Sequence, residues 1–173
     1  MTDLTGRRAL ITGSFERTGL GIAQTLAEQG ADIILHGRSK DERSERAQEH
    51  LAALTGQTPQ VLFGDITDSA VCAALAEQTQ NVSILVNNVG VYRPTDLATT
   101  TAEHWRWTLA GNLDATFLMS QAFLPQLLAS GHGRLIQIGY ITCDRLRATG
   151  HATAYQIAKT GVHSTNAVLH QMK

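Results

Sequence analysis

Residues 8–21 read RALITGSFERTGLG, which is a short apolar run, a glycine-rich turn and the beginning of a helical pattern. The run at 8–12 is typical of a buried strand, and residues 20–29, which end at Gly30, are typical of a helix. A strand that leads through a glycine turn into a helix is the opening unit of a parallel sheet covered by helices. The stretch therefore predicts an α/β fold.

The rest of the chain continues the alternation of short apolar runs with amphipathic stretches. Four more strands are predicted, at 32–36, 60–63, 83–86 and 134–138. Further helices are predicted from the charged stretch 40–50 to near Leu54, at 68–78, over 102–128 as two helices or one long bent helix, and at 153–170. We expect one domain over residues 1–173: a doubly wound, Rossmann-type parallel sheet of five strands in three α/β/α layers.

Composition excludes several classes of function. With 14 basic and 15 acidic residues the net charge is −1, so neither nucleic acid nor an acidic membrane surface is indicated as a partner. Cys72, Cys143 and the seven histidines lack metal-ligand spacing, which predicts two reduced thiols and no metal site. The absence of a membrane-length apolar stretch and of a secretory pattern predicts a soluble, cytoplasmic protein.

The glycine turn lies where a doubly wound sheet binds a dinucleotide. Glycines at positions 13, 19 and 21 let the backbone approach a pyrophosphate, and the following helix points its amide groups at it. A tight strand-to-helix loop without a ligand is the alternative for this turn taken alone. The candidate cofactor contacts in this stretch are Thr12, Gly13, Ser14, Arg17, Gly19, Leu20 and Gly21.

The end of the second predicted strand indicates which cofactor is used. A carboxylate there would bind the adenosine ribose and repel a 2′-phosphate, but this chain has no acidic residue until Asp41. Arg38, helped by Arg17 and Ser39, can bind a phosphate instead. NADP(H) is therefore expected in preference to NAD(H), whereas an arginine on a solvated loop is the alternative.

Polar residues also follow the third and fourth predicted strands. A carboxylate at position 65 can accept from an adenine amino group, or can cap the next helix. Side-chain amides at 87–90 can tie neighbouring strands and flank a cofactor, although they are also ordinary turn residues. An asparagine at 112, within a helical stretch, is mildly unfavourable and indicates a special role. These candidates are Asp65, Ile66, Asn87, Asn88, Gly90 and Asn112.

The sequence YQIAK at 155–159 places Tyr155 and Lys159 four residues apart on one predicted helix. Such residues share a face about 6 Å apart. A nearby ammonium group favours the phenolate and lowers the pKa of a tyrosine, so the phenol can exchange a proton with an alcohol or ketone near neutral pH. Together with a nucleotide-binding fold, the pair indicates hydride chemistry; an ordinary helix-surface pair is the alternative.

Taken in order, these motifs resemble the short-chain dehydrogenase/reductase family from residue 9 to the last predicted helix. The resemblance implies that Tyr155 is the general acid for carbonyl reduction or the base for alcohol oxidation. It implies that Lys159 holds the nicotinamide ribose and assists Tyr155, and that Asn112 holds a water in a proton relay. Asn87 and Gly90 would line the cofactor. The implied substrate is a small carbonyl compound or alcohol.

The sequence departs from the family pattern in three places. The glycine turn is two residues longer, within 14–18. The family's substrate-binding serine falls on Thr142 when counted back from the tyrosine, or on Tyr140 when Ile138 and Gly139 are aligned; either side chain offers an O–H donor. The chain ends at Lys173, where family members continue, so the resemblance implies a domain that is incomplete at its C-terminus and an exposed edge at the fifth strand.

The resemblance also implies a homo-oligomer formed through the helices around 112–128 and 153–170. Two other functions remain open from the sequence. The first is a catalytically silent remnant that binds nucleotide or pairs with a homologous chain. The second is an unrelated flavodoxin-like nucleotide-binding module, which would leave Tyr155, Lys159 and Asn112 without roles.

Overall fold

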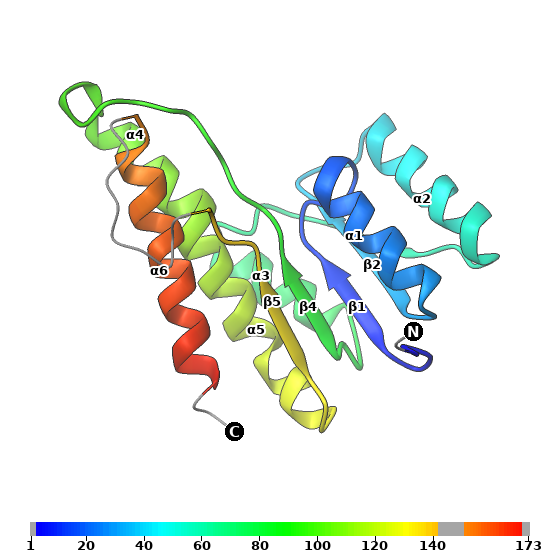
Figure 1. Ribbon diagram of the computed structural model, residues 1–173. Helices are drawn as coiled ribbons and strands as arrows, with labels where there is room; N and C mark the ends of the chain where they lie inside the picture. The colour runs from blue at the N-terminus through cyan, green and yellow to red at the C-terminus, as the bar shows by residue number, and fades with distance from the viewer. Residues whose placement is uncertain (1–2, 142–150, 171–173) are drawn as a thin grey trace.

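The computed structural model describes residues 3–141 and 151–170. It contains one parallel sheet with the strand order β3-β2-β1-β4-β5 (Figure 1). The strands are β1 Arg8–Ile11, β2 Asp32–Gly37, β3 Gln60–Phe63, β4 Ile84–Asn87 and β5 Arg134–Gln137. The five-stranded doubly wound sheet predicted from the sequence is confirmed. The strand order reverses between β1 and β4, which is where such sheets bind ligands at the carboxyl ends of their strands.

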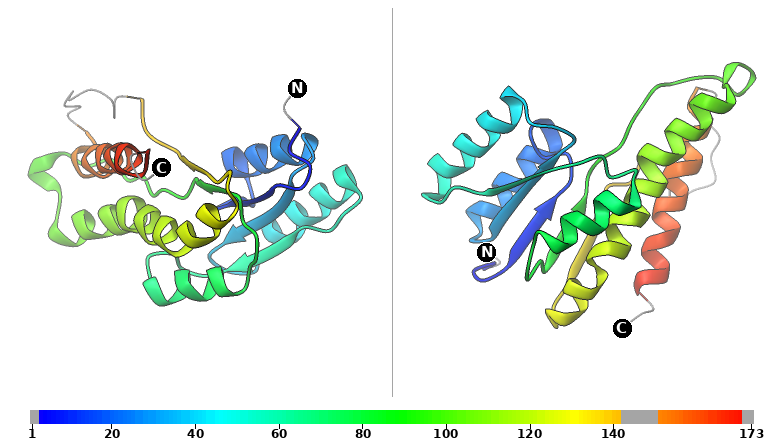
Figure 2. Two further views of the ribbon diagram at one scale, coloured as in Figure 1. Left: turned by 90° about the horizontal axis from the view of Figure 1, so that it is seen from below. Right: turned by 180° about the vertical axis from the view of Figure 1, so that it is seen from behind.

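Helices cover both faces of the sheet, as Figure 2 shows. The α-helices are α1 Arg17–Glu28, α2 Glu42–Thr55, α3 Ser69–Glu77, α4 Ala102–Leu109, α5 Ala115–Ala129 and α6 Thr153–His170. A short 3₁₀ turn, Leu97–Thr99, precedes α4. Helices α1 and α2 pack on one face and α3 and α5 on the other, with α6 against α4, α5 and β5.

Successive strand residues supply the two hydrophobic layers, because side chains alternate between the faces of a strand. Leu10 of β1 faces the α3 and α5 layer, where it joins Met119 and Phe123. Its neighbour Ile11 faces the α1 and α2 layer with Leu51. Both faces are apolar, so the central strands are continuous hydrophobic runs, as the sequence pattern indicated.

The helix termini refine two of the predictions. The cap of α3 is Asp68, whose carboxylate accepts from the Ala70 amide, so Asp65 does not cap this helix. Helix α1 begins at Arg17 rather than at residue 20, which places both Gly19 and Gly21 inside its first turns. Arg17 opens the helix with a positive φ of 50°, the left-handed backbone that turns the chain into the helical direction.

The predicted helical region 102–128 is continuous but not uniform. A π-helical segment, Ala110–Asp114, joins α4 to α5 and carries Asn112. Such wide turns leave local side chains and carbonyls out of the regular helix ladder and are frequent at functional sites. At the far side of the sheet, β5 is the edge strand of the described sheet, and Ile136 is 43% exposed. Within the described residues, no helix is long and apolar enough to cross a membrane.

Candidate cofactor and catalytic site

The predicted site residues gather at the carboxyl ends of the five strands and on the first turns of α6, at the upper end of the sheet in Figure 1. Two groups can be distinguished. One surrounds the glycine turn and the ends of β2 and β3. The other surrounds Gly90 and joins the β4 and β5 ends to α6 and to the π-helical segment.

The glycine turn is held closely against the end of β4. Thr12 is fully buried, and its hydroxyl accepts from the amides of Asn88 (2.9 Å) and Val89 (3.0 Å). The Asn88 side-chain amide donates to the carbonyls of Thr12 (3.0 Å) and Gly13 (3.1 Å). These bonds connect the two strands on either side of the switch point, so Thr12 and Asn88 serve the architecture of the turn.

Glycine is required at the start of α1 because backbone lies against it. A Cβ at Gly19 would collide with the carbonyl oxygen of Gly13, so the first turn of the helix sits directly on the turn that follows β1. Glu16 at the N-cap makes no side-chain capping bond, which leaves the first helical amides without a side-chain acceptor. This cradle of close backbone and a helix N-terminus fits the pyrophosphate of a dinucleotide.

The extra residues of the turn are accommodated on β2. The Ser14 amide donates to the His36 carbonyl, and the His36 amide donates to Ser14 Oγ, both at 2.9 Å. The Phe15 ring lies on Gly37, where a Cβ would collide with it, and 5.9 Å from the Phe63 ring centroid. The longer turn is thus anchored at the ends of β2 and β3, and the first turn of α1 still packs against the Gly13 carbonyl.

His36 is buried at this anchor point and is neutral. Burial lowers its pKa from 6.5 to about 4, although a bond to the Gly64 carbonyl at 3.2 Å acts in the opposite direction. Because a carbonyl only accepts, the neutral ring donates through Nε2. Nδ1 is buried without a hydrogen-bond partner among the described residues.

Arg38 and Asp65, which were predicted to bind a 2′-phosphate and an adenine, pair with each other. Their side chains are 2.8 Å apart and 72% and 43% exposed. Asp65 also accepts from the Thr67 amide and hydroxyl. Although partial burial raises the pKa of Asp65, the bonds from Thr67 and Arg38 outweigh it and hold the pKa below its ordinary value. Ser39 is exposed beside them.

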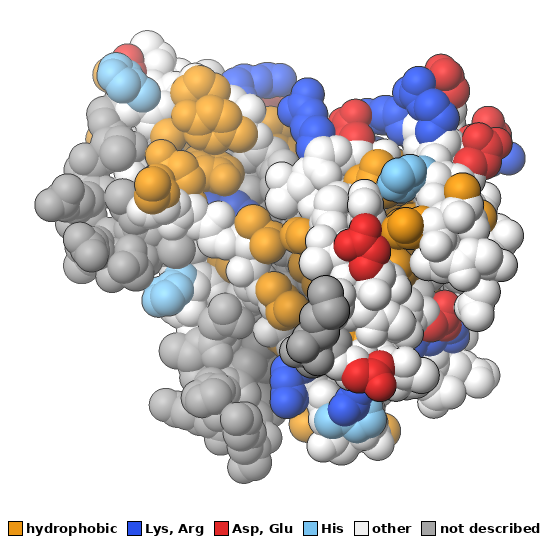
Figure 3. All heavy atoms as spheres, turned by 45° about the vertical axis from the view of Figure 1, so that its right-hand side comes forward, with side chains coloured by type: hydrophobic (Ala, Val, Ile, Leu, Met, Phe, Trp, Pro, Cys, Tyr) orange, Lys and Arg blue, Asp and Glu red, His pale blue; other side chains and the backbone are white. Residues whose placement is uncertain are grey.

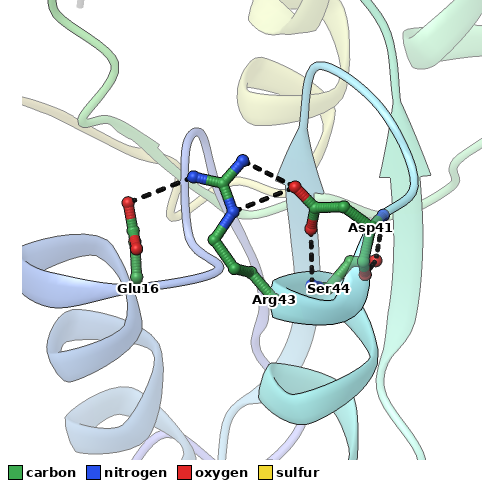
Figure 4. Close-up of polar contacts among 4 residues, drawn as sticks. All are labelled: Glu16, Asp41, Arg43 and Ser44. Carbon is green, nitrogen blue, oxygen red and sulfur yellow. Dashed lines mark hydrogen bonds and ion pairs between the residues drawn. The ribbon is translucent and has the colours of Figure 1, made fainter.

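A second guanidinium lies at the same end of the sheet and was not identified from the sequence. Arg43 donates to Asp41 at 2.9 and 2.6 Å and reaches Glu16 of the glycine turn at 3.4 Å (Figure 4). Asp41 caps α2 through the Ser44 amide, and its bonds to Arg43 lower its pKa. Figure 3 shows that charged side chains gather on this side of the molecule, over the beginnings of α1 and α2. The cluster links the glycine turn to α2.

The second group converges on Gly90. A Cβ there would lie 2.8 Å from Asn112 Oδ1 and 3.2 Å from Lys159 Nζ, so these two atoms face the same bare backbone. Asn112 is fully buried; its amide donates to the carbonyls of Val91 (2.9 Å) and Thr108 (2.8 Å), while Oδ1 has no hydrogen-bond partner among the described residues. An acceptor beside an ammonium group fits a bound hydroxyl or water.

Tyr155 stands next to this pair on α6. The Lys159 Nζ atom is 5.9 Å from the centroid of the Tyr155 ring. The Tyr140 ring approaches Tyr155 edge-on at 5.3 Å, and the Tyr92 ring does so at 4.9 Å. Tyr92 was missed by sequence reasoning, since it lies in an irregular loop with no helical or strand spacing to mark it. Thr142 lies outside the described residues.

The remaining predicted residues have structural surroundings. Asn87 is buried and donates to Ser120 Oγ at 2.9 Å and to the Thr116 carbonyl, which ties β4 to α5. Ile66 belongs to the α3 and α5 core layer, and Leu20 packs against the opposite layer. No group of His, Cys, Asp or Glu within the described residues is arranged to hold a metal ion.

Comparison with known proteins finds relatives over nearly the whole chain. A sequence model described as short chain dehydrogenase matches residues 7–172. Galactitol 2-dehydrogenase (L-tagatose-forming) of Cereibacter sphaeroides is 32% identical over 96% of this chain, and 3-oxoacyl-[acyl-carrier-protein] reductase FabG of Haemophilus influenzae is 33% identical over 91%. The chain spans 65% and 64% of the lengths of these relatives.

A solved structure of similar fold holds a cofactor. The 3-oxoacyl (acyl-carrier-protein) reductase from Agrobacterium tumefaciens C58, solved with NADP bound, is 36% identical and superimposes with a TM-score of 0.85. The superposition covers 94% of this chain and 63% of that one.

Proposed function

Because the chain belongs to the short-chain dehydrogenase family, we propose that it transfers hydride between NADP(H) and a small carbonyl compound or alcohol. One observation carries the proposal: Lys159 Nζ and Asn112 Oδ1 both face Gly90, next to Tyr155, at the carboxyl edge of the sheet. This arrangement brings together an ammonium group, a buried amide oxygen with no hydrogen-bond partner among the described residues, and a phenol. These are the groups needed to move a proton to or from a substrate oxygen.

When bound, the nicotinamide supplies the hydride that forms the new C–H bond of the product. Tyr155 donates its phenolic proton to the carbonyl oxygen, and the positive charge of Lys159 stabilises the phenolate that remains. Lys159 also binds the ribose hydroxyls. Its hydrogen bond to the Ile138 carbonyl holds the ammonium group at the carboxyl edge of the sheet, where the ribose would lie. A water bound to Asn112 Oδ1 passes a proton from solvent, by way of Lys159, back to the Tyr155 phenolate.

The substrate oxygen requires a second donor to stabilise its developing charge. Tyr140 is suited to this role because its ring is already in contact with Tyr155. Thr142 is the other candidate for this role. Tyr140→Phe removes only the hydroxyl, so a large fall in turnover with an unchanged fold would assign the donor to Tyr140.

For the cofactor, the turn from Gly13 to Gly19 and the first amides of α1 bind the pyrophosphate. Arg38 binds the 2′-phosphate, assisted by Arg17 and Ser39, and must leave Asp65 to do so. Asp65 is then available to the adenine amino group. The NADP bound to the A. tumefaciens reductase supports this cofactor for the family.

We also infer a homo-oligomer in which α5 and α6 meet a second copy. Phe117 and Leu128 of α5 and Ile157 of α6 are large apolar side chains that are about half exposed in the single chain. Burying them would stabilise an assembly. Light scattering on the purified protein tests this inference, and a monomer at micromolar concentration would contradict it.

The first experiment is a fluorescence titration of the folded chain with NADPH and NADH, followed by NADPH oxidation assays with ketones and aldehydes. Saturable binding that favours NADPH, with turnover that disappears in Tyr155→Phe, is the expected result. Binding without turnover of any carbonyl compound would favour a nucleotide-binding chain that is catalytically silent. No binding by protein with a native circular dichroism spectrum would refute the proposed cofactor site.

A further inference from the structure

All three tyrosines of the chain meet at one place. The rings of Tyr92 and Tyr140 both approach Tyr155 in T-shaped geometry, with centroid distances of 4.9 and 5.3 Å. They come from three separate segments: the loop after β4, the segment after β5, and α6. Edge-to-face contacts at such distances are favourable, because the positive edge of one ring meets the negative face of another.

Tyr92 is held in position by its neighbours in the loop. The carbonyl of Val91 accepts from the Asn112 side chain at 2.9 Å. On the other side, Thr95 forms a parallel bridge with Ala152, and Asp96 lies 2.8 Å from His151 Nδ1. In Figure 1 this loop runs from β4 to α4 and passes close to the beginning of α6. The same segments that place Asn112 and Tyr155 therefore also place Tyr92.

The fixed ring is nevertheless accessible. Tyr92 is 57% exposed, and Ile141, the residue after Tyr140, is 84% exposed. Two aromatic rings therefore flank the Tyr155 ring on one side, and the Lys159 ammonium group lies 5.9 Å from its centroid. An aromatic ring offers a large apolar surface, and a tyrosine adds one hydroxyl to it.

Building on the proposed function, we propose that the substrates are carbonyl compounds whose C=O group is conjugated to a flat aromatic ring, and that Tyr92 determines this preference. An aromatic substrate ring gains edge-to-face contacts with Tyr92 and Tyr140 while its carbonyl oxygen lies at the Tyr155 hydroxyl. A polyol, in contrast, exposes hydroxyl groups along its whole length, and each needs a hydrogen-bond partner when it leaves water. The substrate named for the galactitol dehydrogenase relative belongs to that other class.

The test compares acetophenone with cyclohexyl methyl ketone, which has a similar size and no aromatic ring, and with fructose. Ketones differ in intrinsic reactivity. The quantity to measure is therefore the ratio of kcat/KM for acetophenone to kcat/KM for cyclohexyl methyl ketone, compared between the wild-type chain and each variant. Tyr92→Leu should lower this ratio roughly tenfold. Tyr92→Phe, which retains the ring, should keep the wild-type ratio. Leu97→Ala, at an exposed position in the same loop, is the matched control and should also keep it.

A binding measurement separates this inference from the proposed activity. Saturation-transfer NMR without cofactor should show acetophenone binding to the wild-type chain more strongly than cyclohexyl methyl ketone, and the difference should be lost in Tyr92→Leu. Selective binding without turnover would support the preference for aromatic carbonyl compounds and contradict the proposed oxidoreductase activity. Turnover with a ratio unaffected by Tyr92→Leu, a preference for fructose, or no acetophenone binding at all would overturn the inference.

Discussion

The Nζ atom of Lys159 donates a 2.8 Å hydrogen bond to the backbone carbonyl of Ile138. This bond joins α6 to the chain that leaves β5, and it holds a buried ammonium group at the carboxyl edge of the sheet. A buried charge is costly unless it is hydrogen-bonded, so the bond fixes where the lysine can be. The position of the positive charge is therefore built into the fold.

Replacing this lysine should separate its chemical role from its packing. Lys159→Met keeps an unbranched side chain in a site that is 3% exposed and removes the charge. We expect turnover to fall roughly 100-fold or more, because the phenolate loses its neighbouring positive charge. Steady-state NADPH oxidation measures this effect, with circular dichroism as the control for folding. Near-normal turnover in a folded variant would remove Lys159 from the mechanism.

Removing the phenol of Tyr155 should abolish the chemistry and leave the cofactor bound. Tyr155→Phe retains the ring that packs against Tyr92 and Tyr140, so the local structure should persist. We expect kcat to fall by roughly 10²- to 10⁴-fold, because the variant lacks the phenol that delivers the proton. The NADPH dissociation constant, from fluorescence, should change little. A variant that still reduces ketones at the wild-type rate would disprove the assignment.

The ion pair between Arg38 and Asp65 predicts opposite effects for its two members. Arg38→Gln should weaken NADPH binding roughly 10- to 100-fold and leave NADH unaffected, because only NADPH has the 2′-phosphate. Asp65→Asn releases Arg38 from an exposed pair, so the preference for NADPH over NADH should rise by roughly 2- to 5-fold. Using the ratio of the two cofactors cancels any loss of an adenine contact. Lys40→Gln, which removes a nearby exposed charge, serves as the control.

Two glycines of the same helix should respond differently to alanine. Gly19→Ala places a methyl group against the Gly13 carbonyl, so we expect a loss of about 1–3 kcal/mol in unfolding free energy and weaker NADPH binding. Gly21→Ala meets nothing within 4 Å and should stabilise α1 by about 0.5–1 kcal/mol. Urea unfolding and NADPH titration of both variants test this. Equal behaviour of the two would show that the contact at Gly19 is unimportant.

His36 predicts a pH dependence of stability. Its pKa is lowered from 6.5 to about 4 by burial, so the unfolded chain binds the extra proton first as pH falls. Stability should therefore be complete above pH 6.5 and decline between pH 6.5 and 4, by about 3 kcal/mol in all. In His36→Gln this part of the decline should be absent. His50→Gln, at an exposed position, should keep the wild-type slope.

The type and order of the elements could be read from local patterns. Helix α6 occupies the predicted range 153–170, and each strand agrees with its prediction to within one residue at either end. Apolar spacing and glycine positions act over a few residues, and so they are visible in the sequence itself. The start of α1 was missed because it depends on Ser14 and Phe15 of the turn packing against β2, a contact between segments that are far apart in the sequence.

By itself, the sequence determined the doubly wound fold and the set of polar residues at the carboxyl edge. The tertiary structure alone decided which of these residues meet. Arg38 pairs with Asp65, Asn112 lies beside Lys159 through a π-helical turn, and Tyr92 joins the ring cluster around Tyr155. These partners are far apart along the chain, and crossover connections and the packing of α6 bring them together. Local periodicity carries no information about such contacts, because they depend on how whole layers are placed against one another.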